Sequence, residues 1–137
     1  QKGFGAELMS RLQMFPPSVG VEGVVRFVIE TIELAGPNAC PPVIVGVGLG
    51  GAFDTVAHIA KKALLRPIGS LHPAPHLAEL EADLLAAINR TGIGPQGLGG
   101  RITALAVHIE AQATHIGALP VAVNLNCSAP RRARVEI

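Results

Sequence analysis

Two cysteines are the residues of this chain whose type and placement point most directly to chemistry. Cys40 precedes the apolar run at 43–47, and Cys127 follows the apolar run at 119–125. Both runs are short and rich in β-branched residues, so each predicts a strand. Loops at strand ends hold metal and substrate sites on rigid supports. Two alternatives stay open: one disulfide, or two buried thiols that act as small apolar side chains, the commonest role of free cysteine.

Of the five histidines, His115 stands apart because it lies in a predicted turn between two strands. It lies 12 positions before Cys127, so an extended strand between them places it near the opposite end from that thiol. A second chain would then be needed to bring the two together. His108 falls inside a predicted strand and His58 inside a predicted helix, which favours a core role for the first and a solvated position for the second. By spacing alone, a structural role is also the simpler interpretation of His115.

Two glycine-rich segments invite comparison with nucleotide-binding loops. Residues 46–51 fit G-x-G-x-x-G, but the acidic residue expected about 20 positions later is missing from the basic, turn-like region 61–73. A nucleotide-binding module is therefore the weaker hypothesis, and a tight, flexible turn at Gly48, Gly50 and Gly51 between strand and helix is the favoured one. Residues 93–100 carry no lysine or hydroxyl residue in the phosphate-loop position, so we expect a rigid loop that is structural or shapes a site.

The chain as a whole predicts one domain over residues 1–137. An apolar content of 49% supplies a substantial core, and a formal net charge of +1 argues against a nucleic-acid surface. No apolar stretch approaches the length of ~20 residues that a membrane helix needs, so we expect no membrane partner. Helical spacing predicts helices at 21–35, 52–65 and 76–90. Short apolar runs predict strands at 43–47, 103–110 and 119–125.

These elements predict a mixed α/β (α+β) fold with helices packed on a small sheet. Residues 1–17 are predicted to be a loop with a short helical piece, and 131–137 are a candidate for one more strand. Three strands leave unpaired edges, which indicates an incomplete piece of a larger domain. The acidic residues Glu79, Glu81 and Asp83 are assigned to the solvated face of the third helix.

Several blocks in this order resemble the α region of iron–sulfur (class I) fumarate hydratases and L(+)-tartrate dehydratases. The resemblance covers nearly the whole chain, and its most specific parts are the two cysteine loops and the glycine-rich loop. The blocks are the run from Cys40-Pro41-Pro42 to Gly50-Gly51, the loop 92–100, Thr103-Ala104-Leu105, Thr114-His115, and Pro120-Val121 with the residues up to Cys127.

The resemblance implies a 4Fe-4S cluster on three cysteines, with one iron open to substrate. Cys40 and Cys127 match the second and third ligands, and the first is expected on an upstream segment outside this chain. His115 matches an active-site histidine. Lys2-Gly3-Phe4-Gly5 aligns with a Lys-Gly-Gly-Gly substrate loop, so Lys2 and Gly5 are implied to bind substrate.

The resemblance further implies that the chain is the C-terminal part of the α domain or subunit of a hydro-lyase. The exposed strand edges and the divided site predict an oligomer such as a dimer, and we expect a cytoplasmic location. The implied substrate would be a small dicarboxylic 2-hydroxy acid such as malate or tartrate, and the implied partner a β subunit or β domain, without which this chain would be inactive. Phe4, Ala6 and Leu8 depart from the family pattern. A non-catalytic or impaired homologue that serves as an assembly scaffold is therefore the alternative.

Overall fold

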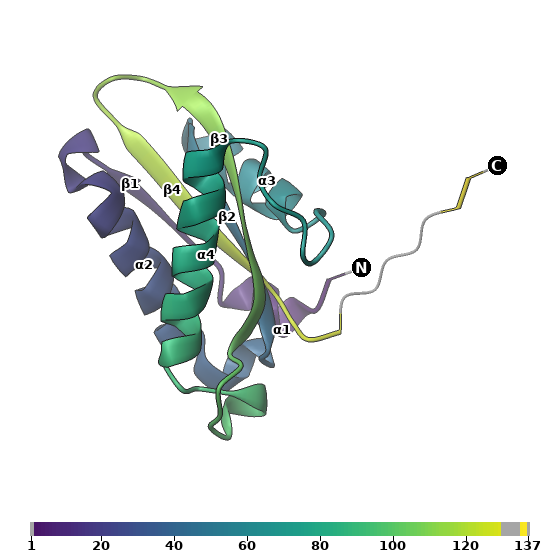
Figure 1. The fold of residues 1–137 in the computed structure, drawn as a ribbon. Coiled ribbons are helices and arrows are strands. Elements are labelled where there is room, and N and C mark those ends of the chain that lie inside the picture. The colour runs from purple at the N-terminus through teal and green to yellow at the C-terminus, as the bar shows by residue number, and fades with distance from the viewer. Residues whose placement is uncertain (1, 130–134, 137) are drawn as a thin grey trace.

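The computed structural model describes residues 2–129 and 135–136, which form a layered α/β unit (Figure 1). One mixed sheet has the strand order β1-β4-β2-β3. β4 is antiparallel to both of its neighbours, whereas β2 and β3 are parallel. The strands are β1 (Arg11–Phe15), β2 (Val43–Gly51), β3 (Ala104–Thr114) and β4 (Leu119–Asn126).

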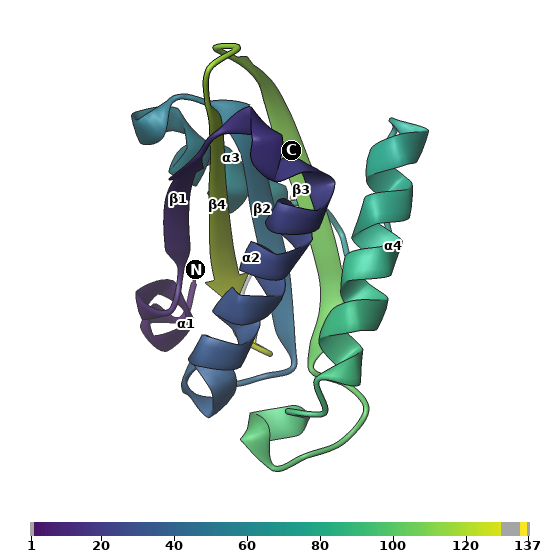
Figure 2. The same cartoon turned by 90° about the vertical axis from the view of Figure 1, so that its left-hand side faces the viewer.

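Helices cover both faces of this sheet, as the two perpendicular views show (Figures 1 and 2). α2 and α4 lie on one face and α3 on the other. Within the described residues, no helix is long and apolar enough to cross a membrane. The helices are α1 (Phe4–Leu8), α2 (Gly20–Ala35), α3 (Phe53–Ala63) and α4 (Pro75–Arg90), and short 3-10 turns lie at Pro17–Val19, Gly36–Ala39 and Pro95–Gly97.

Because both faces are covered, the central strand β2 is apolar throughout rather than alternating. Val45 and Val47 pack into the main core together with residues of α2 and α4. Ile44 points to the other face and packs against Leu64. The mixed α+β fold class predicted from the sequence is confirmed, as are the three predicted helices and three predicted strands.

The predicted turn at Gly48, Gly50 and Gly51 is wrong, because β2 continues through all three glycines. A Cβ atom on Gly46 would overlap the carbonyl oxygen of Ala60, and one on Gly48 would overlap the backbone of α3 as well. These two glycines therefore let the backbone of α3 lie directly on the strand, a known use of glycine inside strands.

The fourth strand, β1, is not among the predicted elements, because the sequence predicts only a loop with a short helical piece over residues 1–17. The helical piece is confirmed as α1. β1 pairs with β4 along its whole length, from Arg11 opposite Val123 to Phe15 opposite Leu119. The Phe15 ring meets the Phe27 ring edge-on at 5.4 Å, which anchors the strand to α2. The further strand proposed within 131–137 lies largely outside the described residues.

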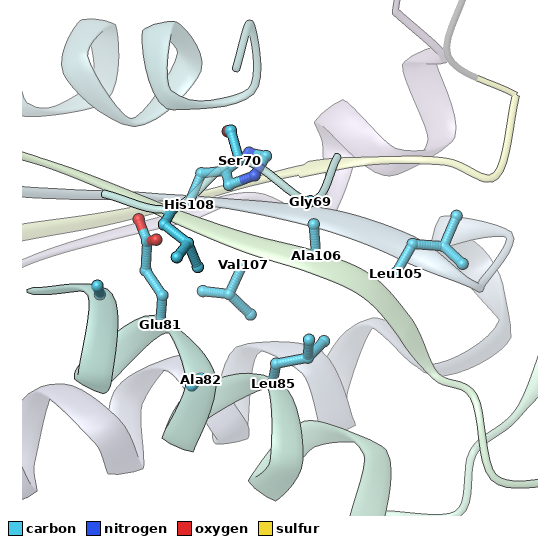
Figure 3. Close-up of a pocket in the computed structure, with 11 residues that line it drawn as sticks. Gly69, Ser70, Glu81, Ala82, Leu85, Leu105, Ala106, Val107 and His108 are labelled. Carbon is cyan, nitrogen blue, oxygen red and sulfur yellow. The ribbon is translucent and has the colours of Figure 1, made fainter. Parts of the chain in front are cut away.

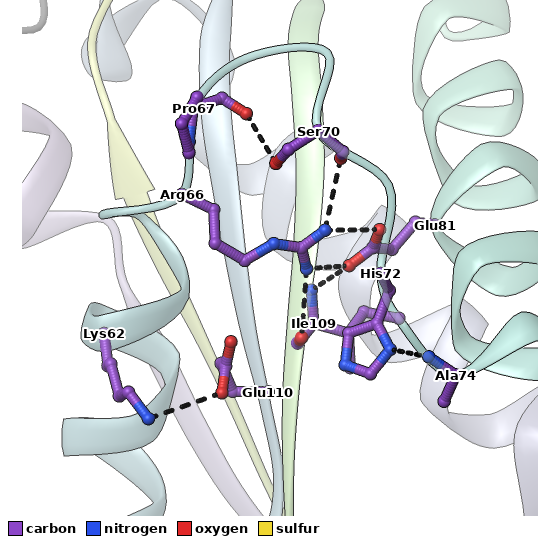
Figure 4. Close-up of polar contacts among 9 residues, drawn as sticks. All are labelled: Lys62, Arg66, Pro67, Ser70, His72, Ala74, Glu81, Ile109 and Glu110. Atoms are coloured by element: carbon purple, nitrogen blue, oxygen red, sulfur yellow. Dashed lines mark hydrogen bonds and ion pairs between the residues drawn. The ribbon is translucent and has the colours of Figure 1, made fainter.

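Glu81 was assigned to a solvated helix face, and this is also wrong, because its side chain is buried. Arg66 donates two hydrogen bonds to the Glu81 carboxylate, at 2.5 and 3.2 Å (Figure 4). The same carboxylate accepts the N–H of Ile109 at 2.7 Å, and Arg66 donates to the Ile109 carbonyl at 3.4 Å. β3 is an edge strand, so this ion pair satisfies backbone groups that no neighbouring strand reaches.

Candidate functional site

The two cysteines meet at one end of the sheet. Cys40 lies before β2 and Cys127 after β4, and the two strands are antiparallel neighbours. The N–H of Ser128 donates a hydrogen bond of 3.3 Å to the Cys40 carbonyl, which joins the two loops directly. Both thiols are free; Cys40 is exposed and Cys127 is half-buried. The tertiary structure thus brings together two potential thiolate ligands that are far apart in the sequence.

The backbone at Cys40 is held in an unusual conformation. Its φ of 53° and ψ of 63° lie in the left-handed region, which costs a residue with a side chain about 1–2 kcal/mol. Its N–H donates to the Pro37 carbonyl at 3.0 Å. Strained backbone of this kind persists where the surroundings over-determine it, and such positions cluster at functional sites. The backbone conformation of Cys40 therefore favours a functional position.

The glycine-rich loop at 93–100 supports the Cys40 loop. The N–H and the side-chain Nε2 of Gln96 both donate to the Pro41 carbonyl, at 2.8 and 3.1 Å. Gly97, with φ of +76°, lies so close to Pro37 that an added Cβ would be 2.6 Å from the proline ring. The loop is thus packed against the site, which supports the expectation that it shapes the site.

The N-terminal segment lies beside both cysteine loops. A Cβ on Gly3 would be 3.0 Å from the Cys127 sulfur, and a Cβ on Gly5 would be 3.1 Å from the Asn38 carbonyl oxygen. Gly5 is exposed, and Phe4 is 80% exposed, so the phenyl ring does not fill the space next to the thiols. Lys2 and Gly5, singled out from the sequence, are therefore brought to the cysteine end of the molecule.

A network of charges connects Lys2 to the sheet. The Lys2 ammonium contacts one oxygen of Glu7 at 2.7 Å, and the Lys61 ammonium contacts the other oxygen at 2.7 Å. Asn124 donates to the same carboxylate at 3.3 Å. Burial raises the pKa of Glu7. The hydrogen bonds from Lys2 and Lys61 together lower the pKa by more than burial raises it, so the pKa falls from 4.5 to about 2. Glu7 is therefore ionised at neutral pH.

Two asparagines share one face of the otherwise apolar strand β4, and the first of them, Asn124, contacts this network. Asn124 and Asn126 are only 7% and 6% exposed. The side-chain oxygen of each has no hydrogen-bond partner among the described residues. Asn124 also lines a hollow of about 190 Å³ together with Glu7 and Ser10. Buried acceptors without partners are costly, so their presence next to Cys127 favours a site for a polar ligand.

His115 lies at the other end of the sheet. It occupies the exposed turn between β3 and β4, where its Nδ1 accepts the N–H of Gly117 at 3.0 Å. The eight-residue strand β4, roughly 26 Å long, lies between it and Cys127. The expectation that these two residues lie at opposite ends is confirmed, and a single chain does not bring His115 to the cysteines. His108 is buried and His58 exposed, as predicted.

A second cavity, of about 170 Å³, lies between α4 and the edge strand β3 (Figure 3). Its walls are mainly apolar, with Leu85, Leu105 and Val107 among them. The carboxylate of Glu81, one of its lining residues, is already engaged by Arg66 and by the backbone of Ile109. Because its charged group is satisfied within the fold, this cavity is a weaker candidate for chemistry than the cysteine end.

The cysteine end fits part of a metal centre. Two free thiols on adjoining, well-supported loops are suitable ligands for an iron–sulfur cluster. Within residues 2–129 and 135–136, no group of three or more His, Cys, Asp or Glu side chains could hold a metal ion. A three-cysteine cluster would therefore need its remaining ligand from outside the part of the chain that the structure describes.

Sequence reasoning did not identify Glu7, Asn124 and Asn126 as members of this site. A signal for the asparagines does exist, since they stand two positions apart in an otherwise apolar strand and so share one face. Glu7 carries no comparable local signal, because its partners lie on α3, β4 and the N-terminal segment.

Comparison with known proteins assigns this chain to a family. The fumarate hydratase (Fumerase) family matches residues 1–136. A protein of Methanocaldococcus jannaschii is 52% identical over 132 residues, which are 96% of this chain and 46% of that protein. The L(+)-tartrate dehydratase subunit alpha of Escherichia coli strain UTI89 is 49% identical over 135 residues, 98% of this chain and 45% of that subunit. The corresponding subunit of strain K12 is 51% identical over 130 residues, 95% of this chain and 43% of that subunit.

The chain thus spans a little less than half the length of these relatives. The match extends through the N-terminal segment, both cysteine loops and the glycine-rich loop, which are the parts that build the site. The chain belongs to the fumarate hydratase (Fumerase) family.

Proposed function

We propose that this chain is part of the α subunit or α domain of an iron–sulfur hydro-lyase. The enzyme would reversibly add or remove water on a small dicarboxylic 2-hydroxy acid such as malate or tartrate. One observation carries the proposal: Cys40 and Cys127 lie on loops that the Ser128–Cys40 hydrogen bond joins at one end of the sheet. Membership of the fumarate hydratase family and the names of the E. coli relatives support the type of reaction.

In this proposal Cys40 and Cys127 hold two of three cysteine positions of a 4Fe-4S cluster, and an upstream segment holds the first. When bound, the cluster supplies a Lewis-acidic iron that makes the hydroxyl group a better leaving group. Lys2 attracts a substrate carboxylate through its charge. The backbone at Gly5, which carries no side chain, allows close approach of the substrate.

We further propose that His115 contacts substrate in the site of a second copy of the chain. The exposed position of His115 and its separation from the cysteines support such an arrangement. A β subunit or β domain would supply the remaining substrate contacts, because the relatives in E. coli are named as alpha subunits. The chain would then be the C-terminal part of the α unit of a cytoplasmic oligomer, and inactive when isolated.

A test of this proposal is anaerobic reconstitution of the complete protein with iron and sulfide. We expect about 4 iron atoms per site and broad thiolate-to-iron absorption. Cys40→Ala and Cys127→Ala should both lose the cluster, whereas Ser128→Ala, which keeps the backbone hydrogen bond, should retain it. Normal cluster content in either cysteine variant would contradict the proposal.

The alternative, a non-catalytic or impaired scaffold, rests on the departures at Phe4, Ala6 and Leu8. Phe4 and Leu8 are exposed, at 80% and 74%, and Ala6 is buried, so none of the three disturbs the packing of α1. Assays of the reconstituted protein with malate and with tartrate separate the two functions. A full cluster without turnover of either acid would favour the scaffold.

A further inference from the structure

We propose that Glu7 is a positioning residue that holds the Lys2 ammonium at the cysteine end of the sheet, ready for a substrate carboxylate. The inference rests on the proposed function, because it assigns to Glu7 the task of orienting a residue of that site. The proposal for this carboxylate comes from the geometry of its contacts and not from the family match.

Glu7 joins four separate segments through one carboxylate. It belongs to α1, where its own N–H donates to the Gly3 carbonyl at 3.2 Å. One oxygen contacts Lys2 and accepts from Asn124 of β4, and the other contacts Lys61 of α3. Ser10 attaches the end of the same segment to β4, by accepting from Asn124 at 3.1 Å and from the N–H of Leu125 at 3.2 Å. The contact that holds the Lys2 ammonium itself is the one with Glu7.

The two lysines bound by Glu7 differ in exposure, and this difference shows which one the carboxylate orients. The Lys2 side chain is 19% exposed, compared with 54% for Lys61. The Lys2 nitrogen itself is buried, and among the described residues its polar contact is the ion pair with Glu7. An ammonium has three N–H donors, so one used by Glu7 leaves two for a ligand. Gly3, the neighbour of Lys2, lies against the Cys127 sulfur, so the backbone at Lys2 lies beside the proposed site.

The balance of charge also fits an anionic ligand. One carboxylate faces two ammonium groups, so the cluster of Lys2, Glu7 and Lys61 keeps a net positive charge. The lowered pKa of Glu7 keeps its carboxylate charged through the neutral range, so the tether persists there. The Arg11–Glu30 pair, at 3.2 Å, is more exposed: its side chains are 32% and 55% exposed, compared with 19% and 30% for Lys2 and Glu7.

The test uses the complete, cluster-loaded protein and succinate, a saturated dicarboxylate that cannot be hydrated. Glu7→Gln keeps the shape of the side chain but removes the charge that holds Lys2. We expect succinate to bind at least 10-fold more weakly by calorimetry, and KM for the hydroxy acid to rise at least 10-fold with a smaller change in kcat. Cluster content should be unchanged. Glu30→Gln, the matched loss of an exposed charge, should alter none of these quantities.

A second readout does not depend on activity. In the folded wild-type protein, an amine-acylating reagent should label Lys2 at least 10-fold more slowly than Lys61, as measured by mass spectrometry of the digest. In Glu7→Gln, labelling of Lys2 should accelerate at least 5-fold. Equal labelling of the two lysines in the wild type would overturn the inference, even if Glu7→Gln failed to fold.

Lys2→Met separates failure of the inference from failure of the proposed function. If Lys2→Met weakens succinate binding but Glu7→Gln does not, Glu7 does not position Lys2 although Lys2 binds substrate. If Lys2→Met changes neither binding nor turnover, the substrate role of Lys2 in the proposed function is wrong, and the inference falls with it.

Discussion

Gln96 donates two hydrogen bonds to the carbonyl oxygen of Pro41, from its backbone N–H at 2.8 Å and from its side-chain Nε2 at 3.1 Å. This relationship joins the glycine-rich loop to the loop that carries Cys40. Gln96 adopts a φ of 55°, unusual for a residue with a side chain, and the double hydrogen bond offsets part of that cost. The glycine-rich loop thus acts as a support for a potential metal ligand.

Replacing Gln96 with alanine should therefore loosen the Cys40 loop. The variant loses one partly buried hydrogen bond but keeps the backbone bond, so we expect a loss of about 1 kcal/mol in the free energy of unfolding. Urea unfolding of the apo form of the complete protein measures this loss in the free energy of unfolding. Gln13→Ala, at an exposed strand position, is the control and should change stability by less than about 0.5 kcal/mol. Equal effects of the two changes would show that the Gln96 side chain is not a support.

The buried pair of Arg66 and Glu81 predicts a large effect of a single substitution. Arg66→Met leaves the Glu81 carboxylate buried without its cation, which costs about 3–5 kcal/mol. Lys62→Met is the matched control, because Lys62 is 62% exposed and lies 3.7 Å from Glu110, so its loss should cost less than about 1 kcal/mol. Thermal or urea unfolding distinguishes the two. A cost of Arg66→Met as small as that of Lys62→Met would contradict the buried pair.

The lowered pKa of Glu7 predicts how stability changes with acid. A carboxylate whose pKa is lower in the folded protein stabilises the fold fully above its ordinary pKa of 4.5 and loses this contribution as the pH falls through about 2. Glu7→Gln should therefore be less stable than the wild type at pH 7, and the difference should shrink between pH 4.5 and 2. Urea unfolding of the apo protein at several pH values tests this. A constant difference across that range would mean that Glu7 does not titrate as described.

Close packing of α3 on β2 predicts that Gly46 tolerates no side chain. The Cβ of Gly46→Ala would meet the backbone of Ala60, which cannot rotate away, so we expect a loss of about 3 kcal/mol or more. Gly69→Ala is the comparison: Gly69 has a φ of +87° and no neighbour within 4 Å of an added Cβ, so only backbone strain of about 1–2 kcal/mol applies. A smaller loss for Gly46→Ala than for Gly69→Ala would argue against the close helix–strand contact.

The position of His115 predicts a complementation experiment. In the cluster-loaded enzyme, His115→Asn should lower kcat/KM at least about 100-fold with the fold and iron content intact. His108→Asn, a change in the core, should affect stability more than turnover.

If a second copy supplies His115, dissociating and mixing the inactive His115→Asn and Cys127→Ala proteins should restore turnover. A mixed dimer then contains one site with an intact cluster and an intact histidine from its partner. Recovery would be absent if His115 served the site of its own chain, and normal turnover of His115→Asn alone would make the residue structural.

The sequence by itself determined the elements whose residues interact with near neighbours in the chain. Helices α2, α3 and α4 follow from apolar residues repeating at 3.6-residue spacing, and three strands follow from short β-branched runs. The same local patterns placed Cys40 and Cys127 at strand ends and His115 in a turn. The segments around these three residues also resemble the family to which the comparison assigns the chain.

Only the tertiary structure decided what depends on partners far away in the chain. Gly48 lies in a strand rather than a turn because α3 packs on it, and Glu81 is buried because an edge strand leaves backbone groups for it and Arg66 to satisfy. Glu7 joins the site because its carboxylate meets charges from the N-terminal segment and from α3. Each of these residues could also have been exposed to solvent. Its actual position depends on contacts with residues far away in the sequence, which a local sequence pattern does not show.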